Sequence, residues 1–158
     1  MDFFVEPDNI WVAASDGNLS DIKKLIASGI DVNAQDEYGY SPLHAAASYG
    51  EMEILEYLLS VGANIALRDE DGDTPLLVSE KPEIFQRLIQ AGADPHATNT
   101  EGHGIVDKAV EDDNEELINY LKENGYITDP NFTYTPGQSE MQEFVNMLEP
   151  VDENEEAE

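Results

Sequence analysis

The stretch AQDEYGYSPLHAAASYGEMEILEYLLSVGAN, residues 34–64, contains the features that decide the fold. Ser41 suits the N-cap of a helix, and Pro42 suits the first helical position, where no N–H is needed. Leu43 and three alanines then follow at 45–47. These residues predict a short helix that is thin enough to pack closely against its neighbours.

A second helix is predicted after Gly50, because apolar residues recur there on one helical face. Gly62 suits the end of this helix as a C-cap. Residues 64–73, with Asp-Gly at the tip, predict a projecting turn before the next helix. We therefore expect an antiparallel pair of helices followed by a turn. The apolar positions of the second helix are Ile54, Leu55, Leu58 and Leu59.

The same features recur along the chain at a fixed interval. SPLH at 41–44 returns as TPLL at 74–77, which is 33 residues later, and a short helix is expected to begin at Pro75. The next interval is 30 residues, since three are missing near Glu80-Lys81-Pro82. A unit of two short helices cannot bury its own apolar face, so its stability must come from stacking on neighbours. Further pairs at the 33-residue spacing are Gly17 and Gly50, Leu25 and Leu58, Gly29 and Gly62, and Asp36 and Asp69.

The pattern D-x-x-G-x-[ST]-P-L-H-x-A-A-x-x-G, followed by L-L and G-A-[DN], resembles the ankyrin repeat. The resemblance implies an all-α repeat solenoid of four helix-turn-helix units with projecting β-turns. We expect a repeat domain over 1–126, with units at about 6–38, 39–71, 72–101 and 102–126. The outer units depart from the pattern: Trp11 stands at the place of His44, and Gly104-Ile105 replaces Thr-Pro. Both end units are interpreted as caps.

The charge of the chain is strongly one-sided, with 35 Asp and Glu against 7 Lys and Arg and a net charge of −28. Nucleic acids and anionic membranes are therefore poor partners, since both require basic residues. A basic protein partner is favoured, whereas simple solubility is the other reading of the charge. With no signal peptide, no long apolar run and no cysteine, we expect a soluble, monomeric protein of the cytoplasm or nucleus.

The resemblance implies that a protein partner binds the turn tips and inner helices. Tyrosines at those places would supply anchors and acids would steer the partner, although a tyrosine could instead pack on a neighbouring tip. Trp11 is expected to pack at the end of the array, and His44 to tie neighbouring turns together. The candidate partner-binding residues are Glu37, Tyr38, Tyr40, Tyr49, Glu70, Asp71, Asp73, Glu101, His103 and Asp112.

Other chemistry finds little support in the sequence. Residues 69–80 place acids at 1, 3, 5 and 12 of a calcium-loop count, but the required sixth-place glycine stands at the fourth place. His96 and His103 lack a carboxylate at helical spacing, so zinc is not expected. The sequence contains no G-x-S-x-G nucleophile motif, no P-loop and no dinucleotide-binding glycine motif. We therefore expect no catalysis and no cofactor. The spacing from Leu25 to Asn33 is similar to the leucine-to-asparagine spacing at which ankyrin asparagines are hydroxylated. The resemblance therefore makes Asn33 a candidate for this modification.

The repeat pattern stops after Gly125, and residues 127–158 carry nine acidic residues and no basic one. Within an extension at 127–150, a short helix is predicted at 139–149, with Ser139 as its N-cap. Docking on the fourth unit and binding of a partner are both open roles for this helix. Residues 151–158 are expected to be a disordered acidic tail. The apolar side of the helix would comprise Met141, Phe144, Val145 and Leu148.

The function that these features favour is non-enzymatic binding of a basic protein. The chain is similar to small acidic ankyrin proteins, among them dedicated chaperones of ribosomal proteins, and this likeness implies a client of that kind. A regulatory adaptor or inhibitor of a signalling or transcription protein is the alternative.

Overall fold

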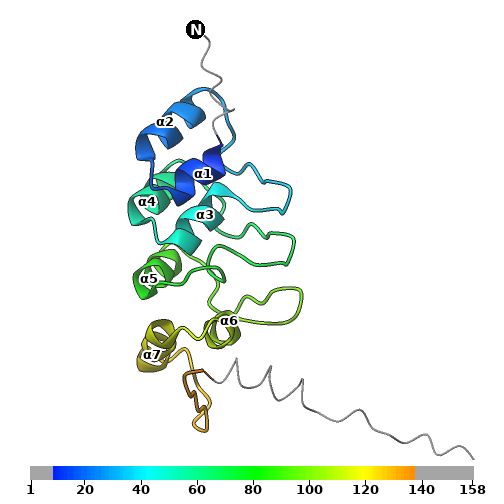
Figure 1. Cartoon of the computed structure of the whole chain (residues 1–158), viewed down its shortest axis with the longest axis vertical. Helices are drawn as coiled ribbons and strands as arrows, with labels where there is room; N and C mark the ends of the chain where they lie inside the picture. Colours follow the sequence, from blue (N-terminus) through cyan, green and yellow to red (C-terminus); the bar gives the residue numbers. More distant parts are fainter. Residues whose placement is uncertain (1–8, 138–158) are drawn as a thin grey trace, which may run out of the picture.

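The computed structural model describes residues 9–137, which form seven α helices and no strand. Figure 1 shows α2, α4, α5 and α7 stacked in one column, α1, α3 and α6 beside them, and long turns projecting from the second column. This arrangement confirms the predicted all-α repeat solenoid. The helices are α1 (Ile10–Ser15), α2 (Leu19–Ala27), α3 (Pro42–Tyr49), α4 (Met52–Ser60), α5 (Pro82–Gln90), α6 (Ile105–Glu111) and α7 (Glu115–Glu123).

The start of α3 follows the prediction from its sequence. The Ser41 side chain accepts a hydrogen bond from the His44 backbone N–H, and Pro42 occupies the first helical position. Gly50 ends the helix in a left-handed conformation, at φ 72°. Leu43 and the three alanines are fully buried, because α3 packs against both α1 and α4. A wider helix would not fit between these neighbours.

The third unit differs from its prediction. We expected a short helix to begin at Pro75, but residues 75–78 form a single turn, in which the Leu77 and Val78 N–H groups donate to the Thr74 carbonyl. Pro82 opens α5 and forces the preceding Lys81 into an extended conformation, at φ −101° and ψ 133°. The three missing residues therefore leave no room for a second turn of helix.

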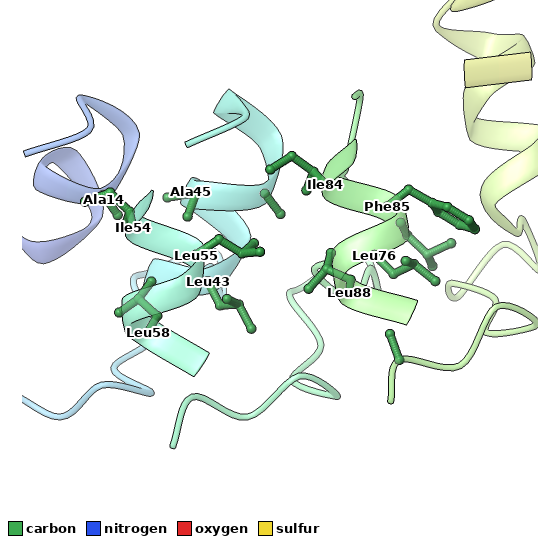
Figure 2. Packing of buried hydrophobic residues seen from close by; sticks show 14 of the residues in the cluster. Ala14, Leu43, Ala45, Ile54, Leu55, Leu58, Leu76, Ile84, Phe85 and Leu88 are labelled. Atoms are coloured by element: carbon green, nitrogen blue, oxygen red, sulfur yellow. The ribbon is translucent and has the colours of Figure 1, made fainter. Parts of the chain in front are cut away.

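The core runs through the stack as a layer of apolar side chains, mostly aliphatic, and Figure 2 shows part of it, with Phe85 among the residues. Each helix pair contributes its buried positions to this layer, for example Ile54, Leu55 and Leu58 of α4 and Ile84 and Leu88 of α5. Because α2 packs on α4 and α5 packs on α7, no pair is covered by its own residues alone. The stability of each unit therefore depends on its neighbours, as the repeat pattern predicts.

Neighbouring turn tips are joined by their backbones. The Glu70 N–H donates to the Tyr38 carbonyl at 2.8 Å, and the Thr100 N–H donates to the Asp71 carbonyl at 2.9 Å. Gly39 makes the first contact possible: its φ is +74°, and a Cβ there would lie 3.0 Å from the Asp69 backbone. The projecting turns thus form one connected edge.

The last described residues contact α5 and the turn between α6 and α7. The Tyr126 ring packs edge-on against Phe85, with ring centroids 5.0 Å apart. The Asp113 carboxylate accepts hydrogen bonds from the Tyr134 hydroxyl and the Gly137 N–H. The predicted helix at 139–149 and the predicted tail at 151–158 lie outside the described residues. The division of 1–126 into four units stays a prediction, and no helix within 9–137 could cross a membrane.

Candidate functional site

The candidate partner-binding residues fall into three groups by exposure. Most of them are exposed at the turn tips or at the ends of α3 and α6, two are half-buried, and one is buried. Tyr38 and Tyr49 stand out among the exposed ones, each with 62% of its surface exposed. Their rings are available to a partner, as an anchoring role requires. The exposed residues are Glu37, Tyr38, Tyr49, Glu70, Asp71, Glu101 and Asp112.

Tyr40 does not project from the tip as expected. Its ring is half-buried and lies 5.2 Å from the His44 ring, and its hydroxyl donates to the His44 carbonyl at 3.2 Å. Burial raises the pKa of the phenol. The Asp36 carboxylate accepts from the backbone N–H groups of both Tyr38 and Tyr40, but only the Tyr38 ring is exposed.

Asp73 and His103 are also less accessible than expected. Asp73 is only 5% exposed, and its Oδ2 lies 3.7 Å from Lys108 Nζ of the next inner helix. The half-buried His103 has its Nδ1 2.7 Å from Glu111 Oε1. Both side chains thus contact residues of α6 within the same chain, because the stacking of the units brings them close to this helix.

His44 has the structural role that the sequence predicts. Its ring is fully buried, and its Nε2 lies 2.8 Å from the Asp73 carbonyl oxygen of the next turn. A carbonyl only accepts, so Nε2 carries the proton, and Nδ1 accepts from Ser41. Burial lowers the pKa of the imidazole. The neutral ring therefore fixes the second turn relative to α3.

A groove at the first end of the array contains residues that the sequence analysis did not assign to the site. It lies between α1, α3 and the first turn and has a volume of about 580 Å³. Trp11 lines it, although its indole N–H donates to the Ala34 carbonyl at 2.9 Å as a packed residue would. Val12, 50% exposed, adds apolar surface. We call this the aromatic groove; it is lined by Asn9, Trp11, Val12, Ser15, Gln35, Asp36, Glu37, Tyr40, Ala45 and Tyr49.

No local sequence signal identifies this groove, because its walls come from two different units. The spacing that could have found it is the 33-residue register, which places α1 beside α3. Positions 12, 15, 45 and 49 then share one side of the two packed helices. The lining of the groove combines apolar and aromatic side chains with the acidic residues Asp36 and Glu37.

Basic residues are placed mainly away from the turn tips. Lys23 and Lys24 belong to α2, Arg87 to α5 and Lys122 to α7, all in the first column of Figure 1. Arg87 pairs with Glu56 across two units, at 2.5 Å. In the turns themselves, the Arg68 guanidinium donates to the Gly72 and Thr98 carbonyls. The remaining basic residues are Lys81 and Lys108.

One cluster among the described residues has the composition of a metal site. Asp69, Asp71 and Asp73 of the second turn each offer a carboxylate oxygen, and these atoms lie within 4.8 Å of one another.

Comparison with known proteins agrees with this architecture. Residues 10–80 match the family model "Ankyrin repeats (3 copies)". A curated ankyrin repeat-containing protein of Schizosaccharomyces pombe is 40% identical over 116 residues, which cover 72% of this chain and 56% of the relative. The chain thus spans little more than half of that protein's length. Ankyrin repeats indicate a module for protein–protein interaction, and this chain belongs to the ankyrin-repeat family.

Proposed function

We propose that this chain is a non-enzymatic module that binds a basic protein through the aromatic groove and the acidic turn tips. We propose further that it acts as a dedicated chaperone, whose client is a ribosomal protein or a similar basic protein. The observation that carries the proposal is the groove itself, where exposed apolar and aromatic side chains meet two carboxylates.

Lysine and arginine side chains suit such a groove. Their aliphatic stems can lie on the rings of Trp11 and Tyr49, while the charged group stays near Glu37 at the rim. Such contacts combine cation–π attraction with charge pairing, and each is worth about 0.5–2 kcal/mol. A short basic segment with several such residues would gain affinity from the groove and steering from the charge of the chain.

The exposed acids of the three tips extend this surface beyond the groove. Glu70, Asp71 and Glu101 follow Glu37 along the connected edge of the turns. A client that is basic over a longer surface could therefore contact several units at once. Unassembled ribosomal proteins have this property, since they carry many basic residues that otherwise bind RNA.

The test is affinity purification followed by mass spectrometry, with wild type and a Tyr38→Ala/Tyr49→Ala variant compared. Tyr57→Ala is the control, because Tyr57 lies on the outer helix α4. We expect wild type and the control to retain the same basic proteins, and the double variant to lose them. Each complex should also weaken steeply between 50 and 300 mM salt.

Two results would overturn the proposal. If the basic partners bind the double variant as well as wild type, the rings are not anchors. If the specific partner is a neutral regulatory protein whose binding is insensitive to salt, the chain is an adaptor or inhibitor and not a chaperone of basic clients.

A further inference from the structure

The second turn differs from its neighbours in carrying carboxylates at three alternate positions. At the equivalent places the first turn has Asp36, Tyr38 and Tyr40, and the third has Asn99, Glu101 and His103. The first of the three positions has a function in every turn, because its side chain accepts from two backbone N–H groups. Asp69 Oδ1 does so from Asp71 and Asp73, at 3.0 and 2.9 Å. The turn thus explains Asp69, but not the other two acids.

The three carboxylates are close enough to share one ion. Their oxygen atoms lie within 4.8 Å of one another. Calcium binds oxygen ligands at about 2.3–2.6 Å, so two ligands on opposite sides of the ion are about 5 Å apart. The observed spacing is therefore compatible with a single cation held by all three carboxylates.

Asp73 supplies an independent indication of a ligand. It is more than nine-tenths buried, yet its Oδ1 has no hydrogen-bond partner among residues 9–137. A buried carboxylate requires a partner for its charge, and Lys108 Nζ lies 3.7 Å from the other oxygen, Oδ2. An ion beside Oδ1 would satisfy the oxygen that the protein leaves without a donor.

Space for an ion exists beside Asp73. A cavity of about 190 Å³ is lined by Asp71, Asp73, Asn99, Thr100, Glu101 and Lys108. Glu101 could add a further oxygen from the next turn.

We propose that Asp69, Asp71 and Asp73 form a binding site for a hard divalent cation of the calcium type. All candidate ligands are oxygens, the ligand class that Ca²⁺ prefers. The site is not the twelve-residue calcium loop that the sequence superficially resembles, because its glycine, Gly72, stands at the fourth place. The ion would instead be held on one turn tip, against the start of the next unit. The Lys108 ammonium group would compete with the ion for the Asp73 carboxylate.

The test is isothermal titration calorimetry with CaCl₂ in 150 mM KCl, on the full chain. We expect one Ca²⁺ per chain, with a dissociation constant of about 10⁻⁴–10⁻³ M, typical of sites with few ligands. Asp73→Asn should weaken binding at least about tenfold, since it removes the buried charge. Glu123→Gln is the matched control: it removes one exposed charge at the end of α7 and should leave binding unchanged.

A second variant separates a specific site from general attraction to an acidic protein. Lys108→Gln removes the competing ammonium, so Ca²⁺ should bind more tightly than to wild type. Thermal unfolding without Ca²⁺ checks that each variant folds, and Ca²⁺ should raise the Tm of wild type more than that of Asp73→Asn. Equal binding by wild type, Asp73→Asn and Glu123→Gln, or only weak binding at many sites, would overturn the proposal.

Discussion

Replacement of His44 by Phe tests the link that holds α3 to the next turn. Phe keeps a planar aromatic ring at this position, slightly larger than imidazole, but removes both nitrogens. The Asp73 carbonyl keeps the Asp69 N–H as a donor, but the Ser41 N–H and the Ser41 hydroxyl both lose their acceptor, inside a region that water does not reach. An unsatisfied buried polar group costs about 1–3 kcal/mol. With two such groups, we expect the free energy of unfolding at pH 7.5 to fall by about 2–4 kcal/mol.

The effect of this substitution should depend on pH in a defined direction. Burial lowers the pKa of His44 in the folded state, whereas the pKa of a histidine in an unfolded chain is about 6.5. Below that pH, His44 binds a proton in the unfolded state but not in the folded state. The free energy of unfolding of wild type therefore falls, whereas that of His44→Phe does not fall for this reason. The difference between the two proteins should therefore shrink between pH 7.5 and 5.5, by up to about 1.4 kcal/mol.

The assay is urea unfolding followed by circular dichroism at 222 nm, at pH 7.5, 6.5 and 5.5. His96→Phe is the matched control, since His96 is exposed in the turn after α5, and it should change stability by less than about 0.5 kcal/mol. A cost for His44→Phe no larger than that of the control would refute the buried hydrogen-bond link. If the stability difference between wild type and His44→Phe stays constant with pH, the claim that the folded His44 ring is neutral is wrong.

Two further predictions concern packing and the end of the array. Ala46→Leu should destabilise the protein by about 1–3 kcal/mol in urea unfolding, because Ala46 is fully buried in the thin helix α3 and extra methylenes overpack it; an unchanged midpoint would contradict this account of the stack. The Asp113 carboxylate raises the pKa of Tyr134 to about 12, so the Tyr134 Cζ resonance in ¹³C NMR, assigned by its loss in Tyr134→Phe, should titrate well after those of the exposed tyrosines. Asp113→Asn should return the pKa of Tyr134 to about 10, and a Tyr134 resonance that still titrates late in this variant would exclude the contact.

Much of the fold could be predicted because the helix ends within each repeat are determined by residues close together in the sequence. Ser41, Pro42 and Gly50 mark the ends of α3 by capping and backbone preference alone. The place of His44 also followed from the motif, and its buried bonds confirm it. These features depend on residues a few positions apart, where sequence patterns are most informative.

The remaining features depend on contacts between units. The turn at 75–78 replaces a helix because Pro82 begins α5 too soon, and the motif at Thr74 does not reveal this competition. Asp73 is buried because α6 of the following unit covers it, and Tyr40 turns inward onto α3. Such outcomes are set by neighbours about 30 residues away, which a single repeat does not specify.

The aromatic groove shows the same limit for the candidate site. Tyr49 was identified from its place in one repeat, whereas Trp11 was expected only to pack at the end of the array. In the structure both line one cavity, because α1 and α3 lie side by side. Trp11 therefore both packs and lines the groove, and only the stacked helices reveal the second of these placements.

The central claim is that an aromatic groove rimmed by acids binds a basic protein, and one measurement tests it most directly. The dissociation constant of the most abundant basic partner would be determined for wild type and Tyr49→Ala, at 50 and 300 mM NaCl. We predict that the higher salt weakens binding to wild type at least about tenfold, and that Tyr49→Ala weakens it about tenfold or more at either salt. A dissociation constant that neither the salt nor the substitution changes would contradict the account.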